Sequence, residues 1–342
     1  MKKGKVWLVV GVGVIVAACF LCSACKKGPT ETITLSYANF FPPTHVQSQL
    51  AEAWIKEIQE RTDGAVEITY YPGGTLLKGP EIYEGILKGV ADIGMSVIGY
   101  TRGRFPAMEF IDLPMGYPSG KVATCVINDF YKDMKLKEFD EVKPLYFMAH
   151  GPGIIHSKKP IKTLDDLKGM KIRTYGFGTK IIEGLGAVPV SMGQGDAYEA
   201  LQKGVAEATL SPSEVLKGWK QAEVIKYTVE CYSIGYTAGF FIAMNKEKWD
   251  SLPKSVKKVF EEVSEEFIPK HGEAWDASDK EGLDFSLSLG NEIIPLSEEE
   301  SERWAKALEP VIDGFAKETE AKDIPGTKYV EAIRDLIEKC SK

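Results

Sequence analysis

The sequence contains little that could perform catalysis. Only four histidines occur in 342 residues, and none forms an H-E-x-x-H pair or another close set of metal ligands. No G-x-S-x-G segment is present, "GYPSGK" is one residue too short for a phosphate-binding loop, and the "GFG" and "GQG" turns lack the rest of a dinucleotide fingerprint. We therefore expect no enzyme, no metal and no cofactor. A secreted hydrolase with a triad assembled in space stays open as an alternative.

An excess of positive charge is also absent. The formal net charge is −7, whereas a nucleic-acid-binding protein is normally basic, so no nucleic-acid partner is expected. The apolar content of 44% and the charged content of 27% are ordinary for a soluble globular protein. A chain of 342 residues exceeds what one hydrophobic core usually needs, which predicts two domains.

Cysteine is scarce outside the N-terminal region. Three of the six cysteines fall within the first 25 residues, and the others are Cys125, Cys231 and Cys340. Their spacing does not suggest a metal site. The export signal described below implies a compartment that permits disulfides, and a bridge between Cys125 and Cys231 is one option. We expect buried free thiols instead, because sequence separation alone does not show which cysteines meet.

Residues 1–25 have the composition of a secretory signal peptide. Three lysines precede an uncharged apolar run at 6–21, which is short for a membrane span, although a retained anchor helix is the alternative. The segment ends in "CSAC", which resembles a bacterial lipobox and predicts a lipid on Cys25; Cys19 in "VAAC" is the rival site. These features predict a periplasmic or cell-surface protein that a lipid anchors to a membrane.

Strands and helices alternate along the rest of the chain. Apolar alternation or short apolar runs predict strands, and apolar residues at helical spacing predict helices. The expected strands are 32–40, 65–74, 91–99, 142–151, 170–176 and 206–212, and the helices between them include 45–64, 81–90 and 195–205; 154–169 is expected to form a loop and a short helix. This order is typical of parallel βαβ units, so we expect an α/β fold with mostly parallel sheets.

A long helical pattern follows at 255–290 and continues through Pro269, which should kink it. A helix of this length exceeds one small domain, so we expect it to span both halves of the molecule. No Pro-rich or Ser-rich linker separates the halves. Several extended crossings should therefore join them.

Polar and aromatic residues gather at the predicted strand ends. In open α/β sheets, ligands bind outside the carboxyl ends of the strands. The candidate residues at these positions are Phe40, Phe41, Tyr100, Arg173, Tyr175, Gln194 and Ser211. Each has a structural alternative: core packing for the aromatic residues, turn or cap chemistry for Gln194 and Ser211, and an ion pair within the protein for Arg173.

Several segments together resemble a known family. "DLKGMKIR" at 166–173, "LGAVPVSMGQGDAYEALQKGVAEATLSP" at 185–212 and "WDSLPKSVKKVF" at 249–260 are the most specific, and 51–74 and 84–94 also match. In this order and spacing they resemble the TRAP-transporter solute-binding proteins of the DctP type, over residues 32–335. The resemblance implies a two-lobed, periplasmic binding protein-like fold with a long helix that crosses both lobes. It places lobe I at 32–151 plus about 238–279, and lobe II at 152–237 plus about 280–342.

The resemblance also implies a function. Such a protein captures a small organic acid between its lobes and delivers it to the membrane subunits of a TRAP permease; a sensory receptor for an organic acid would share these features. Arg173 matches the arginine that forms a salt bridge with the ligand carboxylate in this family. Ser211 and Gly153 replace polar residues of other members, which disfavours dicarboxylates and sialic acid. With Tyr236 and the other aromatic residues nearby, we expect a monocarboxylate with an apolar or aromatic body.

Overall fold

The structure is a computed structural model, and it describes residues 32–342. The predicted signal peptide and both candidate lipidated cysteines, Cys25 and Cys19, lie outside the described residues. Among the helices from residue 32 onward, none has the length and apolar character needed to cross a membrane.

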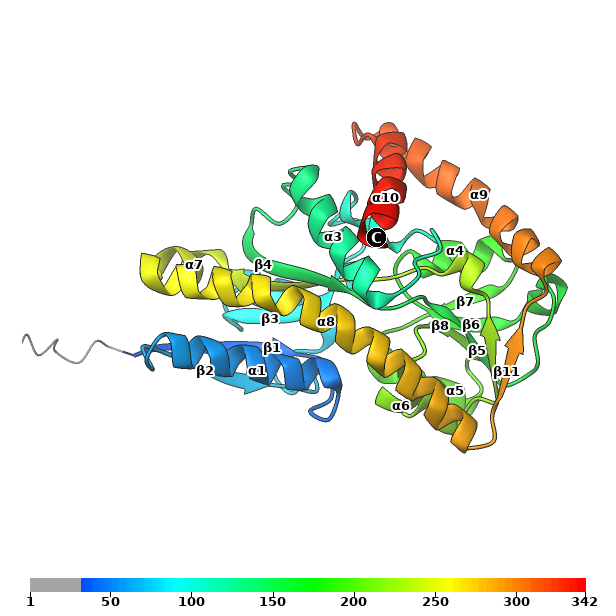
Figure 1. Cartoon of the computed structure of the whole chain (residues 1–342), viewed down its shortest axis with the longest axis horizontal. Coiled ribbons are helices and arrows are strands. Elements are labelled where there is room, and N and C mark those ends of the chain that lie inside the picture. The colour runs from blue at the N-terminus through cyan, green and yellow to red at the C-terminus, as the bar shows by residue number, and fades with distance from the viewer. Residues whose placement is uncertain (1–31) are drawn as a thin grey trace, which may run out of the picture.

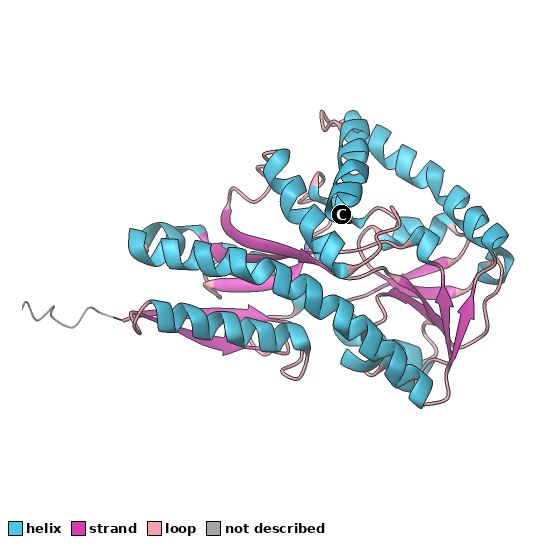
Figure 2. Cartoon of the chain, in the orientation of Figure 1, coloured by secondary structure: helices cyan, strands magenta, loops and turns pink. Residues whose placement is uncertain are grey.

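Two separate sheets form the centres of the two halves of the molecule (Figure 2). The first sheet has the strand order β2-β1-β3-β10-β4. Its strands are β1 (Ile33–Asn39), β2 (Val66–Tyr71), β3 (Ile93–Val97), β4 (Val142–Ala149) and β10 (Gly239–Asn245). Strand β1 is parallel to β2 and β3, whereas β10 runs antiparallel to both β3 and β4. The carboxyl ends of β1, β3 and β4 therefore lie at the same edge of this sheet.

The second sheet has six strands in the order β11-β9-β5-β8-β6-β7. They are β5 (Ile154–Ser157), β6 (Lys171–Thr174), β7 (Val188–Ser191), β8 (Ala208–Ser211), β9 (Tyr227–Glu230) and β11 (Glu292–Pro295). Strands β6, β7 and β8 are parallel, and β5 runs antiparallel to β8 and β9. Each sheet thus has a parallel set and one reversed strand, which makes both sheets mixed.

Strand β5 corrects the sequence prediction, which assigned 154–169 to a loop and a short helix. Residues 154–157 form a strand that is buried along its whole length, and only a 3₁₀ turn at 164–167 remains helical. A strand buried on both faces has no apolar–polar alternation, so its apolar residues do not show the period of two that marks a half-exposed strand.

Ten helices surround the sheets in the described part of the chain. They are α1 (Val46–Arg61), α2 (Ile82–Leu87), α3 (Gly120–Asp133), α4 (Gly178–Gly184), α5 (Gln194–Lys203), α6 (Val215–Gly218), α7 (Lys246–Ser251), α8 (Lys254–Ser288), α9 (Glu298–Glu320) and α10 (Gly326–Cys340). The long helix α8 packs against α1, α3 and β4 of the first half and against α6 and β11 of the second half. It contains Pro269 and changes direction along its course (Figure 1), so the predicted helix that spans both halves is confirmed.

A disulfide joins Cys125 on α3 to Cys340 at the end of α10, with the two Cα atoms 6.1 Å apart. The expectation of free thiols at these two positions is therefore wrong, and so is the alternative Cys125–Cys231 bridge. Cys231 is the buried free cysteine of residues 32–342, and burial raises the pKa of its thiol to about 12. The two bonded cysteines are 215 residues apart, a separation from which no sequence pattern identifies the partner.

The last two helices contact different halves of the molecule. Helix α9 packs against α4 beside the second sheet, whereas α10 packs against α3 beside the first. Segment 280–342 therefore does not lie beside a single sheet, and the lobe boundaries remain a prediction.

Candidate functional site

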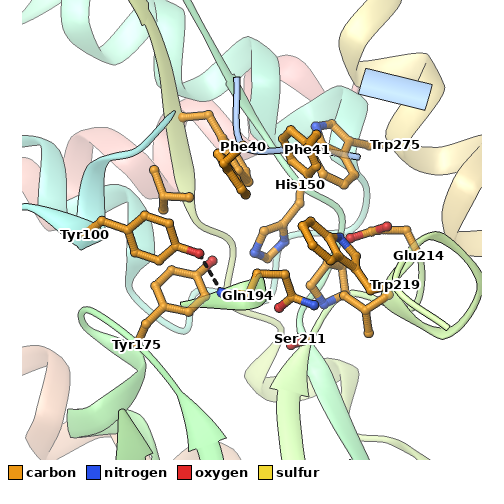
Figure 3. Close-up of a pocket in the computed structure, with 14 residues that line it drawn as sticks. Phe40, Phe41, Tyr100, His150, Tyr175, Gln194, Ser211, Glu214, Trp219 and Trp275 are labelled. Carbon is orange, nitrogen blue, oxygen red and sulfur yellow. Dashed lines mark hydrogen bonds between the residues drawn. The ribbon is translucent and has the colours of Figure 1, made fainter. Parts of the chain in front are cut away.

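Residues at the strand ends of both sheets face one cavity between the two halves (Figure 3). The free space inside it is small, about 20 Å³. It is lined by Phe40, Phe41, Val97, Tyr100, His150, Tyr175, Gln194, Ser211, Pro212, Glu214, Val215, Trp219, Phe240 and Trp275. Its position outside the carboxyl ends of parallel strands is where an α/β sheet normally binds a ligand.

The polar wall of the cavity consists of Gln194 and Ser211, with Arg173 directly behind them. The guanidinium donates hydrogen bonds from Nη1 to Gln194 Oε1 at 2.7 Å and to Ser211 Oγ at 3.3 Å. Its Nη2 donates to the carbonyl oxygen of Met192 at 3.0 Å. All three side chains come from the second sheet or the helix that follows it, so this half supplies the cation.

Arg173 is completely buried and has no counter-ion among residues 32–342. Its accessible surface is 0%, and no carboxylate of the described residues forms an ion pair with it. Nε of Arg173 and Nε2 of Gln194 are buried donors without a partner among residues 32–342. Burial of an unpaired charge costs free energy, so this arrangement favours a site that an anion completes. The structure therefore argues against the alternative of an ion pair within the protein.

The aromatic wall lies opposite and consists of Phe40, Phe41, Phe240 and Trp275. Phe40 and Phe41 directly follow β1, Phe240 lies on β10, and Trp275 lies on α8. The rings of Phe40 and Phe41 stack with centroids 4.4 Å apart, and Phe240 stacks on Trp275 at 5.5 Å. Trp219, after α6, completes this face at 6.3 Å from Phe40. A flat apolar ring of a ligand would find stacking partners on this wall.

A buried hydrogen bond crosses from one half of the molecule to the other beside the cavity. His45 precedes α1, and its Nδ1 accepts a hydrogen bond from the backbone N–H of Gln47 at 3.2 Å. The other ring nitrogen, Nε2, therefore carries the proton and donates to Glu214 Oε2 at 2.8 Å. Glu214 belongs to the second half and is 3% exposed. This bond exists only while the two halves are in contact.

Further contacts show that the two halves are closed on each other. The backbone N–H of Gln194 donates to Tyr100 Oη at 2.9 Å, and the Arg102 guanidinium donates to Thr179 Oγ1 at 2.7 Å. Gly176, with a φ of +52°, lies so close to Gly99 that a Cβ atom on it would be 3.0 Å from the Gly99 Cα. The structure thus has the cavity enclosed and Arg173 away from solvent, rather than in an open, hydrated cleft.

Six of the eight residues that the sequence nominated line this cavity: Phe40, Phe41, Tyr100, Tyr175, Gln194 and Ser211. Arg173 lies behind Gln194 and Ser211. Tyr236 does not line the cavity: its hydroxyl donates to the Leu210 carbonyl at 3.2 Å, and its ring fills the space beside Gly153. The structure therefore gives Tyr236 a packing role behind the wall.

Sequence reasoning missed several lining residues, of which His150, Glu214, Trp219 and Trp275 carry polar atoms. His150 directly follows β4, so the rule of strand ends could have found it. Glu214 comes three residues after the end of β8. Trp275 lies in the middle of α8, and Trp219 follows a four-residue helix, so neither has a strand-end signal.

Comparison with known proteins identifies the family. The family model "Bacterial extracellular solute-binding protein, family 7" (DctP) matches residues 37–319. A TRAP periplasmic solute-binding protein from Desulfovibrio salexigens is 35% identical, with 90% of this chain and 96% of that chain covered and a TM-score of 0.79; its structure is an open complex.

Two further solved structures contain aromatic acids. A TRAP solute-binding protein from Rhodoferax ferrireducens, with copurified benzoate, is 29% identical with a TM-score of 0.86 and covers 91% of this chain and 99% of its own. A marine metagenome protein specific for aromatic acid ligands, with metahydroxyphenylacetate, is 29% identical with a TM-score of 0.87 and covers 91% and 100%. All are binding proteins rather than enzymes. The chain belongs to the bacterial extracellular solute-binding protein family 7, the solute-binding proteins of TRAP transporters.

Proposed function

We propose that this solute-binding protein captures a small aromatic monocarboxylate and delivers it to a TRAP-type transporter. The observation that carries the proposal is the fully buried Arg173, which has no carboxylate partner in the part of the chain that the structure describes and lies behind the polar wall of an otherwise aromatic cavity. A guanidinium is a planar fork that suits bidentate recognition of a carboxylate. We assign the ligand carboxylate to Arg173, with Gln194 and Ser211 beside it.

The shape of the cavity supports an aromatic body for the ligand. The free space of about 20 Å³ in this closed form holds little more than a water molecule, so a ligand would enter as the halves part, and its flat body would lie among the aromatic rings of the lining. The described lining residues include no second cation that a dicarboxylate would need. The relatives that hold benzoate and metahydroxyphenylacetate have the same fold, which supports this ligand class.

The ligand would bridge two lobes that close by a hinge. We assign lobe I to 32–151 plus about 238–279 and lobe II to 152–237 plus about 280–342. Tyr100 and Phe40 would then contact the ligand from lobe I, and Tyr175 from lobe II. Tyr236 would act indirectly, by supporting the floor of the cavity.

We also propose that the protein is a lipoprotein of the periplasm or cell surface, which its lipid anchors to a membrane. The "CSAC" segment supports Cys25 as the lipidated residue. Cys25→Ala should release the protein from the membrane fraction or block its processing. The same effect from Cys19→Ala instead would move the lipid to Cys19.

A thermal-shift screen tests the ligand class. The panel should contain benzoate, phenylacetate, an aliphatic monocarboxylate of similar length, succinate and sialic acid. A ligand at 100 times its dissociation constant should stabilise the protein by about 2.7 kcal/mol. We expect this stabilisation from the aromatic acids first. Stabilisation by succinate or sialic acid alone would contradict the proposal, and calorimetric titration of each positive compound gives its affinity.

A further inference from the structure

The imidazole of His150 is a buried polar group at the centre of the cavity that the assignment of the carboxylate to Arg173 leaves unused. His150 is 1% exposed and lies between the aromatic wall and Gln194 (Figure 3). Its ring is packed against Tyr236, Phe240 and Trp275, with centroid distances of 5.3, 6.2 and 6.1 Å. These rings fix its orientation, so its two nitrogens face defined surroundings.

One nitrogen of His150 has its role fixed by the backbone. Nδ1 lies 2.5 Å from the carbonyl oxygen of Gly151. A carbonyl oxygen only accepts hydrogen bonds, so Nδ1 carries a proton and donates it. Burial and the nearby Arg173 charge lower the pKa of His150 to about 4, so the ring is neutral at pH 7. A neutral ring has a single N–H, and Nε2 is therefore a lone-pair acceptor.

This acceptor contrasts with the other unsatisfied atoms around the cavity. Gln194 Nε2, Trp219 Nε1 and Arg173 Nε are buried N–H donors without partners among residues 32–342, and they suit the oxygens of an acid. His150 Nε2 is also buried without a partner, but it requires a donor. A carboxylate has no hydrogen to give, so the ligand group that pairs with His150 is a different one.

We propose that His150 is a specificity-determining residue whose Nε2 accepts a hydrogen bond from a hydroxyl group of the ligand, so that the protein selects hydroxylated aromatic acids over their unsubstituted analogues. This inference rests on the proposed function and makes its substrate class narrower. A buried acceptor left without a donor destabilises a complex. The analogue that lacks the hydroxyl therefore binds less tightly, although its carboxylate and ring make the same contacts.

The experiment uses matched pairs of acids and isothermal titration calorimetry. Phenylacetate is compared with 3-hydroxyphenylacetate, which has the hydroxyl on the ring, and with mandelate, which has it beside the carboxylate. We expect at least one hydroxy acid to bind about 5- to 150-fold more tightly than phenylacetate. The member of the panel that gains affinity shows which end of the ligand faces His150.

Two variants locate the source of this preference. His150→Phe removes the acceptor and keeps a ring, so the hydroxy acid and phenylacetate should bind within about twofold of each other. His156→Phe is the matched control: His156 is also completely buried with Nε2 unpartnered among the described residues and a pKa lowered to about 4, but it does not line the cavity. This control should keep the preference of the wild type.

The outcomes separate this inference from the proposed function. Binding of all three acids within twofold by the wild type would overturn the role of His150 and leave the aromatic-acid function intact. Retention of the preference in His150→Phe would also overturn it, because the hydroxyl would then pair elsewhere. If no aromatic acid binds while aliphatic acids do, the proposed function fails, and the inference fails with it. The wild-type comparison keeps the inference open to refutation even where a variant does not fold.

Discussion

The two walls of the cavity are built in different ways. The polar wall of Gln194 and Ser211, with Arg173 behind it, is held by hydrogen bonds of 2.7 to 3.3 Å from one guanidinium. The aromatic wall of Phe40, Phe41, Phe240 and Trp275 is held by ring packing. A charge needs directed partners, whereas a ring needs area, so under our proposal one half of the molecule would bind the carboxylate and the other half would bind the body of the ligand.

The largest effect on binding should come from the polar wall. Truncation of one partner of a buried charge pair costs about 2–5 kcal/mol, so Arg173→Ala should weaken binding roughly 30- to 4,000-fold. Arg173→Lys should also lose much of the affinity, because an ammonium keeps the charge and loses the planar fork. Calorimetric titration with the preferred aromatic acid measures both.

Thermal melts of the same variants supply the control. The unliganded protein should keep its melting temperature in Arg173→Ala, because the substitution removes a buried charge that has no counter-ion among the described residues. A sharp fall in melting temperature with unaltered affinity would show instead that Arg173 stabilises the fold and does not bind the ligand.

A smaller effect should come from the contact that holds the two walls together. His45→Asn keeps a residue that can cap α1, but the shorter side chain does not reach Glu214. A hydrogen bond to a charged group contributes about 1.5–3 kcal/mol, so affinity should fall roughly 10- to 150-fold as the closed form loses this bond. Solution scattering should then show a larger radius of gyration at a given ligand concentration.

The matched control is Lys217→Ala. Lys217 forms an ion pair with Glu281 at 2.7 Å near the same place, but both side chains are more than half exposed. Exposed pairs contribute little, so this change should leave affinity and radius of gyration as they are. Equal effects of the two substitutions would show that the His45–Glu214 bond stabilises the closed form no more than an exposed ion pair does.

The aromatic wall should show the next effect. Phe40→Leu keeps apolar volume and loses the stacked ring. Aromatic pairs contribute about 0.5–1.5 kcal/mol beyond their buried area, so aromatic acids should bind roughly 2- to 13-fold less tightly. An aliphatic monocarboxylate of similar length should bind as it does to the wild type. An equal loss for both classes of acid would mean that this wall stabilises the ligand through buried apolar area and not through ring stacking.

The smallest effect on binding should come from the disulfide, which touches neither wall. Cys340→Ser should leave affinity unchanged and lower the free energy of unfolding by about 2–5 kcal/mol, as is typical when a native disulfide is removed. Denaturant titration measures the stability and calorimetry the affinity. Weaker binding in this variant would show that the packing of α10 on α3 influences the geometry of the binding site.

The order of elements was predictable from the sequence because strands and helices differ in apolar period, and α8 is long enough for its pattern to be unambiguous. Strand β5 was not, because a fully buried strand lacks alternation. The Cys125–Cys340 pair depends on the return of the chain to α3 after 215 residues, and no local signal records that path.

The residues of the site also divide into those that a sequence rule could find and those that it could not. The rule that ligands bind at strand ends placed Phe40, Tyr100 and Ser211 at the cavity, and it covers His150 as well. Trp275 reaches the cavity from the middle of a helix, so only the packing of α8 across both halves brings it there. Tyr236 lies behind the wall, because its nearness in sequence to β10 does not specify which way its ring points.

The contact between Gly99 and Gly176 has a consequence for engineering. A Cβ atom on Gly99 would be 3.3 Å from the Gly176 Cα, tighter than ordinary van der Waals contact, and a larger side chain there would act as a wedge. The same Cβ atom would lie 3.4 Å from Asp112 Oδ2 in its own half, which is ordinary contact, so a small side chain would oppose mainly the approach of the other half. Substitution of Gly99 by small side chains of increasing size would therefore shift the open–closed balance in steps, and would convert the protein into a sensor with an adjustable working range.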